Sequence, residues 1–220
     1  MAVPSAPWQS RVASEARAAP EFAAFVLALG PLLASSPRGD GHDVLVLPGL
    51  GADDQSTAPL RWLLARLGYR TYGWGLGRNR GFSRSVTSGL DELLAARTGG
   101  RPVTLLGWSL GGVHAMELAH REPSAVRSII TLGSPLAGRV GPAGIPVTSV
   151  FSRTDAIVPW RASKLPERDG MENVVVRGSH LGLGHNPAVA VVVADRLARQ
   201  PSHWQPFVPP RWARGWFPDA

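Results

Sequence analysis

The chain has 220 residues, of which 44% are hydrophobic, and carries a net charge of +7 from 23 basic and 16 acidic residues. This length and composition suit a single domain with one sizeable core. The basic residues, nearly all arginine, are scattered rather than gathered in a stripe, which argues against nucleic-acid binding and allows only mild attraction to anionic surfaces. No cysteine is present and no histidine spacing suits a metal, so we expect neither metal nor cofactor.

Residues 1–36 are expected to form an extended arm and then a helix over residues 14–35. The apolar run at 22–34 is too short to span a bilayer and contains Gly30-Pro31, so we interpret it as part of an amphipathic helix on the protein surface. Peripheral contact with a lipid surface is a further role open to it. Acidic residues precede the run where a secretory signal needs a basic flank, so we expect a cytoplasmic protein rather than a secreted one.

Residues 37–200 alternate short aliphatic runs with helical patterns. This alternation predicts an α/β fold, in which a mostly parallel sheet of about six strands carries helices on both faces and a binding crevice at the strand carboxyl ends. Residues 201–220 contain three tryptophans and are expected to pack across the domain as a tail. Strands are predicted at 43–47, 69–74, 103–108, 128–132, 147–151 and 173–176, and helices at 56–67, 83–97, 110–122 and 186–199.

The stretch from Val103 to Gly112 predicts a strand, a sharp turn and a helix around a Gly-x-Ser-x-Gly pentad. Ser109 would sit at the tip of that turn in a strained backbone conformation, which proteins keep mainly where a side chain must be presented. Gly107 and Gly111 would allow the strand and the helix to approach closely. The pentad alone is a weak signal in a glycine-rich chain, but its position between strand and helix makes Ser109 the candidate nucleophile.

A serine hydroxyl needs a base to take its proton, and an imidazole base needs a carboxylate to orient it. Asp155 follows a predicted strand closely and is the candidate acid. The loop after the last strand offers two bases: we favour His180, just beyond the strand among small residues, over His185, which stands directly before a helix cap. His114 and His120 lie six apart on one helix and are expected to be packed or solvated.

Two backbone N–H groups are candidates for an oxyanion hole. One belongs to Leu110, at the start of the helix after the serine, and the other to Leu50, in the glycine-rich loop after the first core strand. The alternative for Leu50 is a plain turn before a helix. Candidate walls of the substrate site, with ordinary packing as the alternative, are Trp74, Trp108, Leu136 and Trp160.

Over residues 43–199, in motif order and spacing, the chain resembles the α/β-hydrolase superfamily, specifically its small esterases and lipases. The resemblance is carried by Pro48-Gly49-Leu50-Gly51, Gly107-Trp108-Ser109-Leu110-Gly111-Gly112, Thr154-Asp155-Ala156-Ile157-Val158-Pro159 and Gly178-Ser179-His180-Leu181-Gly182-Leu183. It implies Ser109 as nucleophile, Asp155 as acid, His180 as base, and Leu50 with Leu110 as oxyanion-hole donors. The superfamily's oxyanion loop often begins His-Gly; here Pro48 replaces that histidine, which changes the support of the loop.

The expected function is hydrolysis of carboxylic esters through an acyl-enzyme intermediate. The connection at residues 136–145, where the superfamily often inserts a cap domain, is short, so we expect an accessible site for a small-molecule or lipid ester. Alternatives are an amidase, a thioesterase or a glycolipid-anchor deacylase of the same fold, and a non-catalytic binding protein. The sequence leaves the oligomeric state open.

Overall fold

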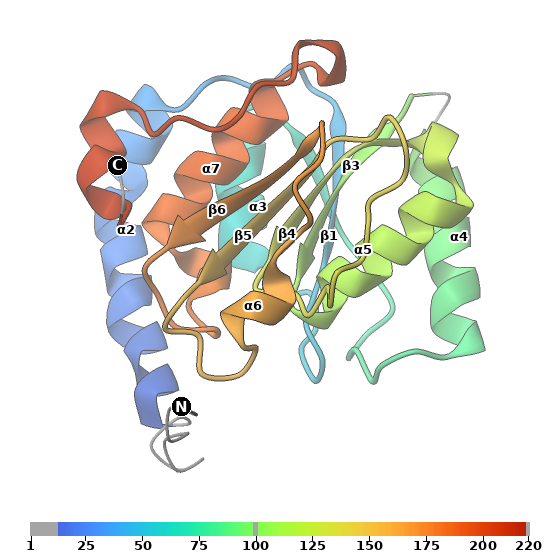
Figure 1. Ribbon diagram of the computed structural model, residues 1–220, viewed down its shortest axis with the longest axis horizontal. Helices are drawn as coiled ribbons and strands as arrows, with labels where there is room; N and C mark the ends of the chain where they lie inside the picture. The colour runs from blue at the N-terminus through green and yellow to red at the C-terminus, as the bar shows by residue number, and fades with distance from the viewer. Residues whose placement is uncertain (1–12, 99–100, 219–220) are drawn as a thin grey trace.

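The fold is built on a parallel sheet of six strands (Figure 1). The computed structural model describes residues 13–98 and 101–218. Every neighbouring pair of strands is parallel, and the order across the sheet is β2-β1-β3-β4-β5-β6. The strands are β1 (Asp43–Leu47), β2 (Arg70–Gly73), β3 (Val103–Trp108), β4 (Val126–Leu132), β5 (Val147–Ser152) and β6 (Met171–Val176).

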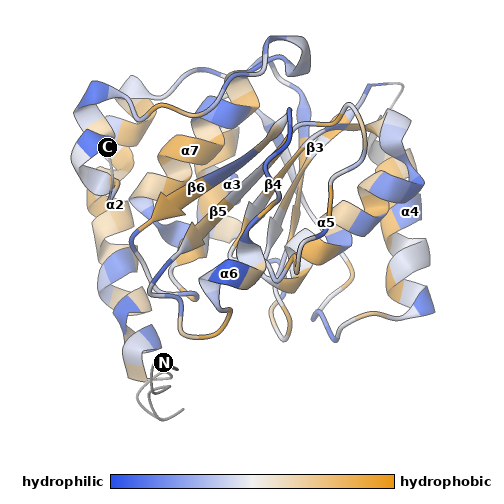
Figure 2. Ribbon diagram, in the orientation of Figure 1, coloured by the Kyte–Doolittle hydropathy of each residue, from blue (hydrophilic) through white to orange (hydrophobic). Residues whose placement is uncertain are grey.

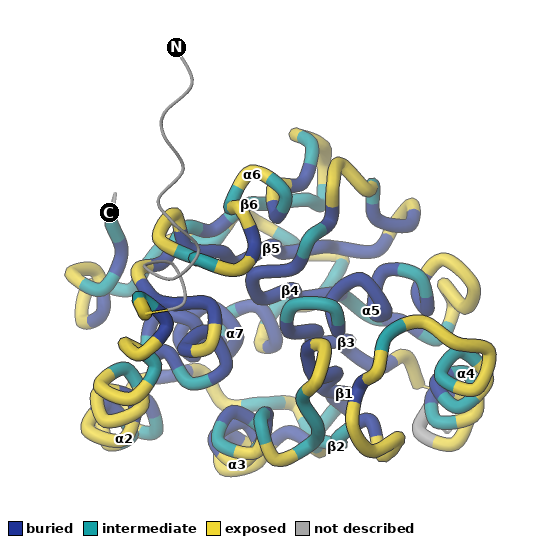
Figure 3. Tube along the Cα trace, turned by 90° about the horizontal axis from the view of Figure 1, so that it is seen from below, coloured by how far each residue is buried: buried dark blue, intermediate teal, exposed yellow. Residues whose placement is uncertain are grey.

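Helices cover both faces of the sheet, as the view onto one end of the strands shows (Figure 3). One face carries α2 (Ala18–Ser35), α3 (Ala58–Arg66) and α7 (Pro187–Ala198), and the other carries α4 (Arg84–Thr98) and α5 (Leu110–Arg121). A short helix, α6 (Trp160–Ser163), follows β5. This three-layer arrangement confirms the predicted α/β class with a parallel sheet.

The sheet separates two hydrophobic cores. Along β1, Val44 and Val46 pack on the side of α2, α3 and α7, whereas Leu45 and Leu47 pack on the side of α4 and α5. Each of these four side chains is at most 1% exposed. Burying an aliphatic side chain contributes about 1.5–3 kcal/mol, so a strand that is apolar on both faces is stable in the middle of three layers.

The chain reverses its direction across the sheet between β1 and β3. From β1 it passes through α3 to β2 at one edge, and α4 then returns it to β3 on the other side of β1. In parallel sheets, the point of reversal opens a crevice at the carboxyl ends of the two strands. The loop that follows Leu47 and the turn that follows Trp108 therefore meet at one edge of the sheet.

Gly30 and Pro31 lie inside helix α2, within the predicted range of residues 14–35. The helix differs from the sequence prediction in two other respects. Residues Glu15–Ser35 form a 21-residue stretch that contains an 18-residue window with a mean hydropathy of 1.5, which by length and composition alone is enough to cross a bilayer. The helix is also not amphipathic in the expected sense, because it has apolar residues on its outer side as well as on the side that packs on the core through Phe25, Ala28 and Leu32.

The other predicted helices and strands are present, with ends within a few residues of those expected. Residues 1–12 of the extended arm expected before residue 14 lie outside the described residues. The short helix α6 and four 3-10 segments were not predicted, because they are too short to leave a periodic pattern. These segments are η2 (Pro123–Ala125), η3 (Leu183–His185), η4 (Pro201–His203) and η5 (Arg211–Trp216). A fifth, η1 (Glu15–Arg17), lies within the predicted helix at 14–35.

Two connections bear on the site and on α2. Residues 133–146, between β4 and β5, contain no helix or strand, so they build no cap over the sheet edge. The described part of the tail, up to residue 218, returns along the face covered by α2 and α7 (Figure 1). It packs on the core there through Phe207, Ala213, Trp216 and Phe217.

Candidate active site

Ser109 occupies a tight turn between β3 and α5. Its backbone has φ 53° and ψ −123°, a conformation that costs a residue with a side chain about 1–3 kcal/mol. The turn is held by the Ser109 N–H, which donates to the Leu132 carbonyl at 2.8 Å, and by the Gly112 N–H, which donates to the Ser109 carbonyl at 3.0 Å. The half-buried serine is thereby presented at the carboxyl edge of the sheet.

Glycines make this turn sterically possible. A Cβ on Gly107 would lie 2.3 Å from the Cα of Gly112, and a Cβ on Gly111 would lie 2.2 Å from the Leu47 carbonyl oxygen. Both distances are far inside van der Waals contact, so the close approach of strand and helix requires glycine at each position, as predicted. A Cβ on Gly49 would lie 3.1 Å from the Ser109 Cβ, so the loop after β1 lies directly against the serine.

Asp155 and His180 form a buried pair at the same edge of the sheet. His180 Nδ1 lies 2.6 Å from Asp155 Oδ2, and the two side chains are 5% and 1% exposed. The other carboxylate oxygen accepts the N–H groups of Ile157 and Val158 at 2.8 and 2.7 Å, which fixes the carboxylate with Oδ2 toward the imidazole. The sequence-predicted acid and base are therefore brought together, and Nε2 of His180 is left outside this bond.

Neighbouring residues connect the acid–base pair to the serine turn. Leu132 accepts the Ser109 N–H, and a Cβ on the next residue, Gly133, would lie 3.1 Å from Asp155 Oδ2 and 3.2 Å from His180 Nδ1. On the other side, the indole N–H of Trp108 donates to the His180 carbonyl at 3.2 Å. Trp108, directly before Ser109, and Gly133, directly after the residue that accepts the Ser109 N–H, thus lie against the pair.

The two predicted oxyanion-hole donors flank Ser109. The first N–H groups of a helix have no acceptor within the helix, and Leu110 is the first residue of α5. The Leu50 N–H belongs to the loop that contacts Ser109 through Gly49. Within residues 13–98 and 101–218, neither N–H donates to a protein acceptor, so both are free to bind a ligand oxygen.

Asn79 supports the loop that holds Leu50. Its side-chain amide donates to the Pro48 carbonyl at 2.9 Å. Its backbone carbonyl accepts the Gly51 N–H at 2.7 Å, and its backbone N–H donates to the Ala52 carbonyl at 2.8 Å. Asn79 is 0% exposed. It therefore supports the loop in which Pro48 stands where the superfamily often has histidine. Sequence reasoning missed it because an asparagine among glycines and arginines resembles an ordinary turn residue.

The other histidines are engaged elsewhere. His185 Nε2 lies 3.0 Å from the Ala18 carbonyl and its ring meets Phe22 edge-on at 5.3 Å, so His185 anchors α2. His120 Nδ1 lies 2.7 Å from the Met116 carbonyl of its own helix. His114 is buried, which lowers its pKa. Among the residues that the structure describes, no three His, Asp or Glu side chains gather in a way that could hold a metal ion.

The predicted substrate walls are only partly at the surface. Trp74 and Leu136 are at most 1% exposed and lie in the core on the side of α4 and α5, so neither offers a surface to a substrate. Trp74 is held there by its indole N–H, which donates to the Gly77 carbonyl at 2.7 Å. Trp108 lies beside His180, with ring centroids 6.3 Å apart. Trp160, half-buried, stacks on Phe151 at 6.1 Å.

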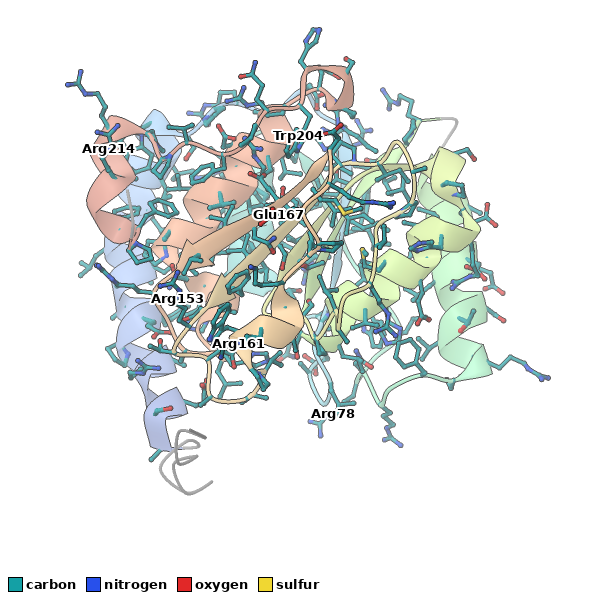
Figure 4. All side chains as sticks on the ribbon, in the orientation of Figure 1. Arg78, Arg153, Arg161, Glu167, Trp204 and Arg214 are labelled. Atoms are coloured by element: carbon teal, nitrogen blue, oxygen red, sulfur yellow. The ribbon has the colours of Figure 1, made fainter. Side chains whose placement is uncertain are left out.

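Exposed apolar side chains occupy the loops at this edge instead. Large hydrophobic residues at least 44% exposed occur in the loops after β1, β2, β5 and β6, namely Leu50, Phe82, Ile157 and Leu181. They were missed because a lone apolar residue in a polar loop carries no periodic signal. The same end of the molecule carries Arg78, Arg153 and Arg161, labelled in Figure 4. This edge therefore combines apolar contacts with positive charge.

Part of the chain is similar in sequence to known esterases. Two curated relatives share the name pimeloyl-[acyl-carrier protein] methyl ester esterase. The one from Shewanella sp. (strain MR-7) is 32% identical over 109 residues, which is 47% of this chain and 39% of the relative. The one from Shewanella woodyi (strain ATCC 51908 / MS32) is 33% identical over 98 residues, or 44% of this chain and 37% of the relative. The matches thus span well under half of the length of these relatives.

Solved structures share the fold at low sequence identity. A hydrolase of the alpha/beta superfamily from Xanthomonas campestris pv. campestris has a TM-score of 0.52 at 22% identity, covering 73% of this chain and 98% of its own. The pyrethroid hydrolase PytH has a TM-score of 0.59 at 16% identity, covering 73% and 98%. The family model for the alpha/beta hydrolase fold matches residues 27–171, well over half of the chain. The chain therefore belongs to the alpha/beta hydrolase fold family.

Proposed function

We propose that the protein is a serine hydrolase that cleaves carboxylic esters, with Ser109 as nucleophile, His180 as base and Asp155 as orienting acid. The observation that carries the proposal is the strained Ser109 turn packed against a buried carboxylate–imidazole pair. Strain of this kind persists where a side chain must be presented, and a buried pair with a bond of 2.6 Å suits an imidazole that has to accept a proton.

The reaction follows from the positions of these groups. Ser109 Oγ attacks the ester carbonyl carbon while His180 Nε2 takes its proton, and Asp155 stabilises the resulting imidazolium through Nδ1–H. The N–H groups of Leu50 and Leu110 stabilise the oxyanion, a contribution of about 3–4 kcal/mol per donor in related chemistry. His180 then returns the proton to the leaving alcohol, and water releases the acyl group by the same steps.

The surroundings of the site favour an ester that combines an apolar part with a negative charge. The exposed apolar side chains of the surrounding loops suit short or medium acyl chains, and the absence of helix or strand in residues 133–146 leaves the edge accessible. The arginines at this edge favour an anionic substrate. The two matched relatives, both named methyl ester esterases, support the ester class.

Reaction with a fluorophosphonate probe tests the proposal. We expect the wild-type chain to be labelled and the Ser109→Ala variant not to be, and we expect turnover of p-nitrophenyl butyrate to be lost in parallel. Turnover of an amide or a thioester with the same acyl chain, in place of the ester, would identify an amidase or a thioesterase. Release of the acyl chain from a glycolipid would identify a glycolipid-anchor deacylase. A folded wild-type chain that neither reacts with the probe nor hydrolyses any of these substrates would point to a binding protein.

We further propose that the outer face of α2 docks on an anionic lipid surface. Phe22, Val26 and Leu27 are 44%, 48% and 83% exposed, and the middle of the helix is coloured as hydrophobic in Figure 2. The one charged residue between Ala18 and Ser35 is Glu21, which points inward to Ser179. An apolar face of this kind inserts at the boundary of the head groups and acyl chains, while the opposite side of α2 stays packed on the protein core.

Charge complementarity favours an anionic bilayer as the occupant. Arg177 and Trp216 border α2 in a hollow of about 290 Å³ next to Ala24 and Ala28. Arg214 extends outward beside its far end (Figure 4). The chain carries a net charge of +7, and each basic residue near an anionic membrane contributes about 1 kcal/mol to binding.

Vesicle sedimentation tests this contact. We expect the wild-type chain to bind vesicles of phosphatidylcholine with phosphatidylglycerol, less so at high salt, and not vesicles of phosphatidylcholine alone. Leu27→Glu should abolish binding. Ser88→Glu, which adds the same charge on exposed α4 at the opposite side of the sheet, should leave it intact. Equal binding of both variants would overturn the lipid contact, as would self-association of the wild type that Leu27→Glu abolishes.

A further inference from the structure

Four backbone positions that flank the acid and the base are bonded to the same N-terminal segment. The buried Glu15 carboxylate accepts the N–H of Ala156, directly after Asp155, at 3.1 Å. Its other oxygen accepts the N–H of Leu181, directly after His180, at 2.8 Å. One carboxylate thus joins the loop of the acid to the loop of the base.

Glu21 and Arg17 complete the same contact. Glu21 accepts the N–H of Ser179, directly before His180, at 2.8 Å, and the hydroxyl of the same serine at 2.7 Å. Arg17 donates to the carbonyl of Thr154, directly before Asp155, at 3.0 Å. The residues on either side of both Asp155 and His180 are therefore held by side chains from residues 15–21.

The loop of the base is shaped to receive these carboxylates. Ser179 is 0% exposed, and its hydroxyl, which donates to Glu21, also accepts the Gly182 N–H at 3.0 Å. A Cβ on Gly182 would lie 1.5 Å from Glu21 Oε2, so this position has room for the carboxylate only as glycine. Backbone N–H groups that bind a carboxylate form charge-assisted hydrogen bonds, which are about twice as strong as neutral ones.

We propose that Glu15 and Glu21 are positioning residues that hold His180 in register with Asp155 and Ser109. This inference rests on the proposed hydrolase function, and it gives the N-terminal helix a role in the chemistry beyond packing. The two carboxylates act through the backbone on each side of the imidazole. Displacement of a catalytic group by about 1 Å can cost 10²-fold in rate, so loss of such a support is expected to lower kcat rather than raise KM.

The first test compares Glu15→Ala and Glu15→Gln with Glu172→Gln in the full chain. Glu172 is a matched control: its buried carboxylate also accepts a backbone N–H, that of Phe207 at 2.7 Å, but at the start of β6, away from the site. With p-nitrophenyl butyrate we expect kcat to fall about 10²-fold in Glu15→Ala and less in Glu15→Gln, which keeps one acceptor oxygen, with little change in KM. Glu172→Gln should lose thermal stability and keep its kcat.

The second test follows the imidazole directly. The proton on His180 Nδ1, shared with Asp155, gives a low-field NMR resonance, which we expect to shift or broaden in Glu15→Ala and Glu21→Gln under conditions where circular dichroism shows a folded chain. Gly182→Ala displaces the Glu21 carboxylate by a different route and should have the same effect. Gly182→Ala therefore also tests the positioning role if a glutamate variant fails to fold.

The outcomes separate this inference from the function on which it rests. Folded Glu15 and Gly182 variants with wild-type kcat and an unchanged Nδ1 resonance overturn the positioning role, and so does an equal loss of kcat in Glu172→Gln. Lack of probe labelling and turnover in the wild type overturns the hydrolase. In that case the Nδ1 resonance, which needs no turnover, still decides whether the glutamates orient His180.

Discussion

His180 and Asp155 meet across 25 positions of sequence, with Nδ1 of the imidazole 2.6 Å from Oδ2 of the carboxylate. Both side chains are almost fully buried, and the carboxylate is fixed by two backbone N–H groups. The imidazole can therefore rotate little, and its second nitrogen is left for the reaction.

The two histidines of the last loop should respond oppositely to substitution. We expect His180→Ala to lower kcat on p-nitrophenyl esters by roughly 10⁴-fold or more, because Ser109 then lacks a base. His185→Ala should keep kcat within about one order of magnitude, since its ring bonds to the Ala18 carbonyl and not to Asp155. Steady-state kinetics on both variants decides the assignment, and the reverse pattern would exclude His180 as the base.

Asn79→Asp should impair the oxyanion hole without unfolding the chain. The new carboxylate keeps the shape of the side chain but cannot donate to the Pro48 carbonyl, so the loop that carries Leu50 loses its support. We expect kcat to fall about 10–10²-fold. Asn173→Asp is the control: Asn173 also bridges backbone groups, those of Leu165, but away from the site, and should leave kcat unchanged. Equal loss in both variants would argue against a specific role for Asn79.

Two glycine-to-alanine changes should have opposite signs in urea unfolding. Gly111→Ala places a Cβ 2.2 Å from the Leu47 carbonyl oxygen, a backbone atom that cannot move aside, and should destabilise the chain by about 3 kcal/mol or more. Gly30→Ala meets no atom within 4 Å and lies inside α2, so it should stabilise the chain by about 0.5–1 kcal/mol. Similar effects of both changes would mean that the turn is looser than its geometry indicates.

His114 should make stability fall in mild acid. Burial, and next the charge of Arg121, hold its pKa below the ordinary 6.5. Below pH 6.5 the unfolded chain therefore binds a proton at His114 that the folded chain does not bind. The free energy of unfolding is highest above pH 6.5 and falls as the pH drops toward the pKa of His114 in the folded chain. Burial likewise lowers the pKa of His42, which adds to the same slope.

Urea unfolding of the wild type and of His114→Phe between pH 5 and 8 isolates this contribution. The His42 contribution cancels in the comparison. We expect the wild type to lose more free energy of unfolding than the variant as the pH falls below 6.5, with parallel curves at the alkaline end. Parallel curves over the whole range would show that His114 does not titrate as its burial indicates.

The sequence by itself determined the features that depend on local pattern. The alternation of aliphatic runs with helical periods specified a parallel sheet of six strands, since each element must bury a side that its own residues define. The pentad around Ser109 specified the strained turn, because Gly107 and Gly111 are needed within that turn itself. The start of α7 was likewise predicted from Asn186-Pro187. The Asn186 side chain caps the helix by accepting two N–H groups of its first turn.

Tertiary structure decided what depends on contacts between distant segments. His180 and His185 have similar neighbours in the sequence, but the folded loop turns only the ring of His180 toward Asp155. Asn79 supports a loop 31 positions away, and Glu15 reaches across 166 positions to Leu181. A single polar side chain carries no periodic signal, and its partner is fixed only when the sheet brings the loops to one edge; the sequence therefore contains these residues without marking what they hold.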